Sequence, residues 1–138
     1  MSRQFVDGHN KVRERYGVPP MKWNNKLARY ARRWSNAMRK DCQLLHSGGN
    51  SYGESVFRSG KSTGWNATAK DAVWSWSAEE PLYDKSTGKC VAGRPYKDCG
   101  HFSLMVSEKN QKIGCGRAEC YGGAVFMTCN YFVPNRDP

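Results

Sequence analysis

The six cysteines constrain the fold of this chain more than any other feature. Their number is even, no two stand in a C-x-x-C arrangement, and all but the first lie in the last 49 residues: Cys42, Cys90, Cys99, Cys115, Cys120 and Cys129. The missing C-x-x-C spacing weakens both a zinc cluster and a thioredoxin-like motif. Six free thiols in a cytosolic protein are the alternative, but the clustering favours three disulfides formed in an oxidising compartment.

The composition is typical of a small domain held together by aromatic rings and crosslinks. Leu, Ile, Val and Phe make up only 20 of the 138 residues and the net charge is +10, a balance that leans towards disorder. Five Trp and seven Tyr point the other way, because each ring buries a large area and disulfides restrict the unfolded chain. We therefore expect one globular domain over residues 1–138, and a monomer.

The sequence indicates an extracellular protein. No apolar run approaches a membrane span, and Met1 leads directly into polar sequence instead of a signal peptide. Because disulfides favour secretion, we expect a mature domain whose signal peptide is absent from this sequence. Asn66-Ala67-Thr68 fits the glycosylation sequon, a weak pattern that leaves glycosylation of Asn66 open.

Apolar residues at helical spacing predict four helices. The first runs over about 3–16, the second is capped by Asn24 or Asn25, the third covers about 66–78, and a brief one follows at 101–107. The side chains expected to face inward are Phe5, His9, Val12 and Tyr16, then Leu27, Ala31, Trp34 and Met38, then Trp65, Ala69, Ala72, Val73 and Trp76.

Two extended runs near the C-terminus, 113–119 and 124–131, surround a Tyr-Gly-Gly turn and predict a β-hairpin. Cys120 and Cys129 flank this hairpin, where they could face each other. One more extended piece is expected at 54–57, within a loop region rich in Gly, Ser and Asn. Helices first and an antiparallel pair last indicate an α+β domain.

Short motifs of unusual composition recur along the chain in a fixed order. They are His9-Asn10, His46-Ser47-Gly48-Gly49, Tyr52-Gly53-Glu54, Trp74-Ser75-Trp76-Ser77-Ala78-Glu79, Cys99-Gly100-His101-Phe102, Gly114-Cys115 and Cys129-Asn130-Tyr131. Together they resemble the signature set of the superfamily that unites plant pathogenesis-related family one proteins, cysteine-rich secretory proteins and venom antigen five proteins. The six cysteines and the Leu44–Gly49 stretch look most like the plant branch.

This resemblance implies a three-layer α–β–α sandwich with a central antiparallel sheet. It also implies the disulfide pairs Cys42–Cys115, Cys90–Cys99 and Cys120–Cys129, one of the fifteen connectivities that six cysteines allow. With this pairing, two of the three disulfides would hold the segments that carry His46 and His101.

The resemblance further implies a central cavity lined by His46, Glu54, Glu79 and His101. Two imidazoles with nearby carboxylates can hold a divalent ion such as zinc, with His46 and His101 as the ligands. Without metal, each glutamate can accept a hydrogen bond from a histidine and organise the core; this second reading is favoured, and no cofactor is expected to be required. His9 lies on an apolar helix face and is read as a core histidine.

Two enzymatic functions are alternatives to a non-enzymatic one. A zinc hydrolase or protease is the runner-up, although the chain has no H-E-x-x-H helix. Ser47 beside His46 and Ser103 near His101 suggest a serine nucleophile, but sequence neighbours rarely have the needed geometry and no G-x-S-x-G elbow exists. We expect no enzymatic activity.

Basic and loop residues suggest partners. Arg29, Arg33 and Lys40, with Arg32 and Arg39 beside them, form a basic helix face that is either simply solvated or drawn to anionic microbial membrane or wall. Nucleic acid is not expected, since no nucleic-acid-binding motif is present. The resemblance implies sterol or lipid binding by the loop from residue 81 to 90, of which the candidate contacts are Pro81, Leu82, Tyr83, Asp84 and Cys90.

The chain departs from the family pattern at two places. Leu104 and Ser107 stand where the family usually has glutamine and tryptophan, so the packing of a large ring near His101 is missing. The C-terminal segment after Tyr131 lacks the usual Pro-Gly-Asn stretch, so a released signalling peptide is not expected.

The expected function is a secreted, antimicrobial defence protein that sequesters sterols or lipids, with a metal-dependent hydrolase or a receptor-docking signalling protein as alternatives.

Overall fold

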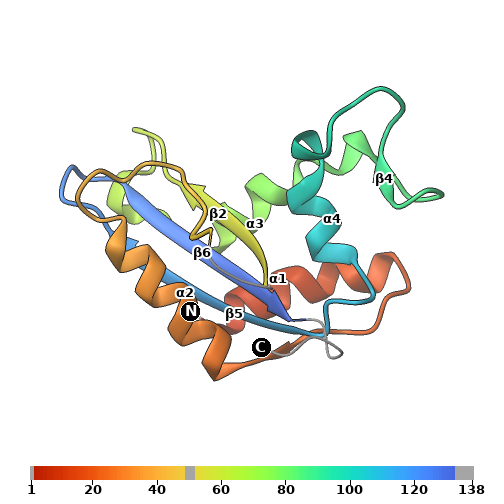
Figure 1. Ribbon diagram of the computed structural model, residues 1–138, viewed down its shortest axis with the longest axis horizontal. Helices are drawn as coiled ribbons and strands as arrows, with labels where there is room; N and C mark the ends of the chain where they lie inside the picture. The colour runs from red at the N-terminus through yellow and green to blue at the C-terminus, as the bar shows by residue number, and fades with distance from the viewer. Residues whose placement is uncertain (1, 49–51, 133–138) are drawn as a thin grey trace.

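The computed structural model of the protein describes residues 2–48 and 52–132, arranged as a sheet between two layers of helices (Figure 1). Helix α2 (Asn25–Ala37) covers one face of the sheet. Helices α1 (Ser2–Arg15), α3 (Ala69–Ser77) and α4 (Gly100–Val106) form the other layer, with α1 in contact with both α3 and α4. The expected α+β, three-layer α–β–α sandwich is confirmed.

The central sheet has the strand order β1-β5-β6-β2. Its strands are β1 (Lys22–Trp23), β2 (Gly53–Arg58), β5 (Lys112–Glu119) and β6 (Val125–Phe132), and only the two-residue β1 runs parallel to its neighbour. The segment between α3 and α4 holds a small hairpin and short 3₁₀ turns: η2 (Glu80–Leu82), β3 (Tyr83–Asp84), β4 (Lys89–Cys90) and η3 (Tyr96–Asp98).

Local sequence signals explain where the helices begin. Helix α2 starts after Asn24, whose side chain accepts a hydrogen bond from the Leu27 amide at 2.9 Å. Helix α3 starts at Ala69, later than expected, because Thr68 and Asp71 form a capping box. The segment before it is a separate 3₁₀ turn, η1 (Gly64–Asn66). Trp65 is therefore 54% exposed, and its expected inward orientation was wrong.

Two glycines of β5 allow α2 to lie directly on the sheet. A Cβ atom at Gly114 would stand 2.2 Å from the Ala28 amide nitrogen, and one at Gly116 would stand 2.5 Å from the Arg32 Cα. Real Cβ atoms almost never approach this closely. The helix can therefore rest on the strand only where these side chains are missing.

A buried arginine ties α1 to the end of α4. Arg13 is 1% exposed, and its guanidinium donates to the carbonyl oxygens of Pro19 at 2.7 Å and of Met105 and Ser107 at 2.9 Å. The last carbonyls of a helix have no partner within the helix. Arg13 supplies that partner for α4 and so holds the helix that carries His101.

The disulfides differ from the expected pairing. Cys90 pairs with Cys99, as the resemblance implied, but Cys42 pairs with Cys120 and Cys115 with Cys129, so the expected Cys42–Cys115 and Cys120–Cys129 pairs are wrong. The hairpin register explains the difference: Cys115 lies directly opposite Cys129, with Cα atoms 4.1 Å apart. Cys120 lies at the turn and instead meets the chain that leaves α2.

His9 is a core residue, as its place on the apolar face of α1 indicated. It is fully buried, its Nδ1 lies 2.8 Å from the Phe5 carbonyl, and its Nε2 lies 2.7 Å from the Tyr131 hydroxyl. Burial is the largest cause that lowers its pKa from 6.5 to about 4.

This burial predicts a loss of stability in mild acid. The unfolded state takes up the His9 proton near pH 6.5 and the folded state only near 4, so the stabilisation is present above pH 6.5 and is lost as pH falls towards 4. At pH 4 the loss is about 3 kcal/mol. Urea unfolding of the wild type and His9→Gln across this range measures it, and the variant should show the flatter profile. Parallel profiles would contradict the assignment.

Some expectations fall outside the described residues, namely Gly49 of the His46 motif and the C-terminal segment 133–138. Within residues 2–48 and 52–132, no helix combines the length and apolarity that crossing a bilayer requires.

Candidate functional site

One half of the site is His46 with Glu54. His46 lies in the loop after α2, and Glu54 lies on β2, where its side chain is 8% exposed. Glu54 Oε1 is 3.0 Å from His46 Nδ1 and accepts from the Ser47 amide at 2.8 Å, while Oε2 accepts from the Ser47 hydroxyl at 2.7 Å and from Asn130 Nδ2 at 3.1 Å. A buried carboxylate needs such a set of donors. Glu54 therefore organises the loop that carries His46.

The other half is His101 with Glu79. Glu79 follows α3, and His101 lies in the first turn of α4, directly after the Cys90–Cys99 disulfide. Glu79 Oε2 is 2.6 Å from His101 Nδ1, and Oε1 accepts from the Phe102 amide at 3.1 Å. The His101 ring stacks on Trp76 with centroids 6.0 Å apart. One carboxylate thus both orients the imidazole and satisfies an amide at the start of α4.

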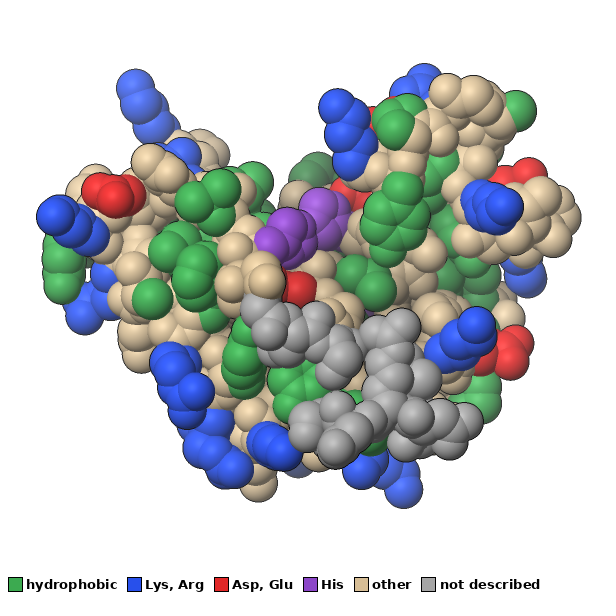
Figure 2. Space-filling view, in the orientation of Figure 1, with side chains coloured by type: hydrophobic (Ala, Val, Ile, Leu, Met, Phe, Trp, Pro, Cys, Tyr) green, Lys and Arg blue, Asp and Glu red, His purple; other side chains and the backbone are tan. Residues whose placement is uncertain are grey.

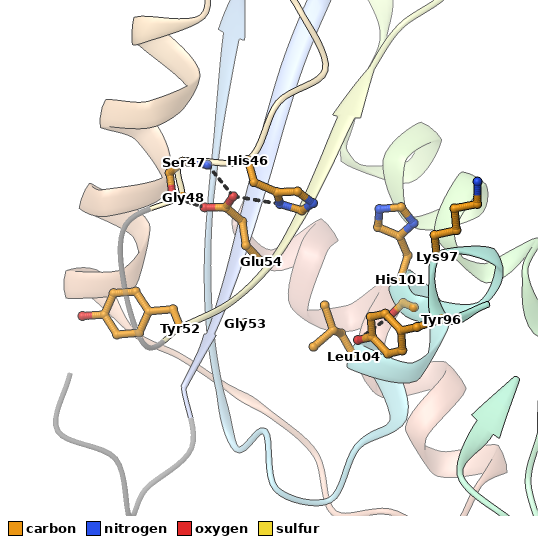
Figure 3. A pocket seen from close by; sticks show the side chains of 11 residues that line it. His46, Ser47, Gly48, Tyr52, Gly53, Glu54, Tyr96, Lys97, His101 and Leu104 are labelled. Carbon is orange, nitrogen blue, oxygen red and sulfur yellow. Dashed lines mark hydrogen bonds and ion pairs between the residues drawn. The ribbon is translucent and has the colours of Figure 1, made fainter.

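The two halves face each other across a pocket of about 440 Å³, which we call the central pocket. Figure 2 shows the histidine side chains in the hollow of this face, and Figure 3 shows His46 and His101 on opposite walls with their rings turned towards the gap. The expected tetrad is thus brought together as two separate pairs. Its histidines and Glu54 line the pocket, whereas Glu79 stands behind His101.

The sequence prediction missed several residues of the pocket wall. They are Ser47, Gly48, Tyr52, Gly53, Tyr96, Lys97, Gly100 and Leu104. Leu104 had been noted only as a departure from the family pattern. The structure places it on the wall, where its Cδ2 packs against the backbone of Gly53. An apolar side chain therefore stands at the position noted above as a departure from the family pattern.

The donor set of the central pocket does not fit a catalytic zinc centre. Zinc sites in proteins use three or four protein ligands. The described residues form no group of three or more His, Cys, Asp or Glu placed to hold a metal ion. Glu54 and Glu79 are each bonded to the Nδ1 of a histidine. The imidazole atoms that remain as possible metal ligands towards the pocket are therefore the two Nε2 atoms of His46 and His101.

A serine nucleophile finds no geometric support either. The Ser47 hydroxyl donates to Glu54 and lies 2.8 Å from the Tyr30 hydroxyl, so neither bond is to an imidazole. Ser103 lines a different groove from His101. A histidine within hydrogen-bond reach is the usual base for a serine nucleophile, and among the described residues neither serine hydroxyl is bonded to one.

A second hollow, which we call the hairpin groove, lies beside the loop expected to bind lipid. It measures about 560 Å³ and is lined by the β3–β4 hairpin and the ends of α1 and α4: Tyr16, Val18, Tyr83, Lys85, Thr87, Gly88, Ser103, Val106, Ser107, Glu108 and Lys109. Of the expected lipid contacts, Tyr83 lines the groove, whereas Pro81, Leu82, Asp84 and Cys90 do not.

Aromatic rings form a cluster at this groove. The Tyr83 ring lies 5.3 Å from Phe102 and 6.1 Å from Tyr16, centroid to centroid. Burial first, and then the hydrogen bond to Glu80, raise the pKa of Tyr16 to about 12, so its hydroxyl stays protonated. The groove therefore combines two tyrosine rings, backed by the buried Phe102 ring, with a polar, charged rim.

Comparisons with known proteins agree with this fold. The family model described as the cysteine-rich secretory protein family, CAP, matches residues 6–131. The chain is 37% identical to a pathogenesis-related protein of PR-1 type from Sambucus nigra, over 96% of this chain and 75% of that protein.

Solved structures agree as well. The venom allergen-like protein 4 of Schistosoma mansoni has a TM-score of 0.68 and 25% identity, covering 94% of this chain and 86% of its own. NaASP2, solved with Zn²⁺, has a TM-score of 0.75 at 20% identity, over 94% of this chain and 77% of its own, a likeness that shows the fold alone. The family match spans nearly the whole chain, and its curated relatives include plant pathogenesis-related proteins, as the motifs predicted. This chain therefore belongs to the CAP family, the cysteine-rich secretory protein family.

Proposed function

We propose that this protein is an extracellular, non-enzymatic defence protein of the pathogenesis-related kind that takes up a sterol or a similar lipid in the hairpin groove. The observation that carries the proposal is the pair of tyrosine rings, Tyr16 and Tyr83, that line a groove of about 560 Å³ and pack on the buried Phe102 ring. Pockets of this size are typical of small-molecule sites, and here two aromatic faces lie among polar and charged side chains. A sterol has this character, with a rigid apolar body and one hydroxyl.

A fluorescent sterol titration with the Tyr83→Ala variant tests this assignment. The wild type should show saturable uptake, and removal of the ring should weaken it about tenfold, because an aromatic side chain contributes a large contact area. Tyr96→Ala, on the wall of the central pocket, is the matched control and should bind like the wild type. Equal binding by wild type and Tyr83→Ala would place the sterol elsewhere, and no saturable uptake by the wild type would end the proposal.

Peptide cleavage assays test the alternative function, a metal-dependent hydrolase. Generic peptide substrates are incubated with and without zinc, and Glu54→Gln and Glu79→Gln remove the carboxylates that hold the two imidazoles. Zinc-dependent cleavage that both variants lose would favour a hydrolase. Sterol uptake that survives both changes would favour the lipid-binding function. If neither activity is found, a receptor-docking role gains support.

An anionic microbial membrane or wall is the proposed partner surface. Arg29, Arg32 and Arg33 are exposed on α2, and the ion pairs seen among the described residues involve none of them. Figure 2 shows a column of basic side chains on this flank of the molecule. Such cations attract anionic surfaces. Binding should weaken as salt rises, because screening shortens the range of the attraction.

A further inference from the structure

Large hydrophobic side chains are exposed mainly around one disulfide. Of the six large hydrophobic residues that are strongly exposed in the described part of the chain, four lie near Cys42–Cys120: Leu44 (57% exposed), Leu45 (50%), Trp65 (54%) and Tyr121 (69%). We call the three segments that carry them, residues 39–45, 58–65 and 117–123, the disulfide tip. In Figure 1 the loop after α2, the β5–β6 turn and the segment before α3 meet at one end of the molecule, far from the β3–β4 hairpin.

Specific contacts fix these segments against one another. The disulfide joins Cys42 to Cys120, and the Tyr121 amide donates to the Arg39 carbonyl at 3.0 Å. The Trp65 indole donates to the Cys120 carbonyl at 3.1 Å. Beneath them, Cys42 and Cys120 pack with Val56 and Phe126 in a small buried cluster of their own. The exposed rings and leucines therefore stand on a rigid base.

The disulfide tip carries a net positive charge. Its segments contain five cations, Arg39, Lys40, Arg58, Lys61 and Arg117, against two acidic residues, Asp41 and Glu119. Glu119 is paired with Arg117 at 3.2 Å. The Arg39 guanidinium lies 4.9 Å over the Tyr121 ring, so a cation and an aromatic face are presented together.

We propose that the disulfide tip docks on an anionic lipid bilayer, with Leu44 and Leu45 entering the interface and Trp65 and Tyr121 lying at headgroup level. Trp and Tyr concentrate at membrane interfaces because their rings are amphipathic. Leucines pointing into water gain from burial in acyl chains, whereas they add little to contact with a hydrophilic glycan. Lysines and arginines around them meet the anionic headgroups. The proposal rests on the membrane partner proposed above and is independent of the sterol groove.

Sedimentation with sterol-free phosphatidylcholine vesicles, with and without phosphatidylglycerol, tests the proposal. The wild type should bind only the anionic vesicles, and Leu44→Ser combined with Leu45→Ser should reduce partitioning tenfold or more. Brominated lipids should quench part of the tryptophan emission in the wild type. That part should be missing in Trp65→Phe, which reports whether this ring reaches the bilayer.

Matched controls separate the tip from other surfaces. Trp74→Ser removes a 74% exposed ring from α3, outside the tip, and should bind like the wild type. Lys40→Gln with Lys61→Gln should weaken binding more than Arg29→Gln with Arg33→Gln on α2. If the wild type binds and the double leucine variant partitions equally well, docking through the disulfide tip is wrong, whereas the anionic membrane remains the proposed partner. Absence of wild-type binding would overturn both, and sterol uptake would be unaffected by either result.

Discussion

Replacing Gly114 by alanine is expected to destabilise the protein by about 4 kcal/mol or more, because the new methyl group would stand inside α2. It would lie 2.2 Å from the Ala28 amide nitrogen and 2.6 Å from the Leu27 Cβ, both part of the helix itself. No flexible side chain can move aside to make room. The helix must shift away from β5, and the shift disturbs the loop after α2 that carries His46.

Gly122→Ala is the matched control for this change. Gly122 lies at the hairpin turn, where an added Cβ meets nothing within 4 Å and the backbone needs no positive φ. Its replacement should alter stability by less than about 0.5 kcal/mol. Urea unfolding of both oxidised variants measures the difference. If Gly114→Ala unfolds at the same urea concentration as the wild type, the close approach of α2 to β5 is not as described.

Replacing Arg13 by methionine is expected to cost about 3 kcal/mol or more. The change keeps much of the side-chain volume but leaves the carbonyls of Pro19, Met105 and Ser107 without their donor. A buried acceptor that loses its partner bears its full desolvation penalty. The damage should concentrate at the end of α4, because two of the three carbonyls are there.

The comparison for Arg13 is Arg15, two residues along the same helix. Arg15 is exposed and pairs with Glu80 on the surface, so Arg15→Met should cost less than about 1 kcal/mol. Unfolding measurements give the two losses, and hydrogen exchange locates them. In Arg13→Met the amides of α4 should exchange faster than those of α2 relative to the wild type. Equal, small losses in both variants would show that Arg13 does not hold α4.

Much of the fold could be predicted from periodicity and turn signals. Phe5, His9 and Val12 at helical spacing gave the buried face of α1, and the Tyr-Gly-Gly turn gave the β5–β6 hairpin. The prediction for Trp65 failed because a capping box at Thr68 and Asp71 starts α3 at Ala69, four residues after Trp65. Aromatic character alone does not show which side of a helix start a ring occupies.

The disulfide pairing needed the register of the hairpin. Cys115 and Cys129 are equally distant from Gly122 along the sequence, and symmetric pairing about the turn places them opposite each other. This symmetry was present in the sequence, but the prediction followed the pairing that the resemblance implied. The close approach at Gly114 carried no comparable signal, since it depends on the distance between α2 and the sheet.

The motifs predicted which histidines and glutamates belong to the central pocket. They did not predict how these residues are arranged. His46 and Glu54 are eight residues apart, and His101 and Glu79 are 22 apart. Their spacing does not show that each carboxylate would face its own imidazole instead of a shared centre. That outcome depends on how α4 is placed against β2.

Because each imidazole is bonded to a glutamate on its own side, a guest molecule that wedges the central pocket wider breaks no ion pair. Such widening would instead act on the pocket wall, where Leu104 packs against the backbone of Gly53. An aliphatic contact can slide, whereas a hydrogen-bonded side chain at residue 104 would be held in one position. A wider guest would therefore act on the contact between Leu104 and Gly53, and both histidine–glutamate pairs would stay intact.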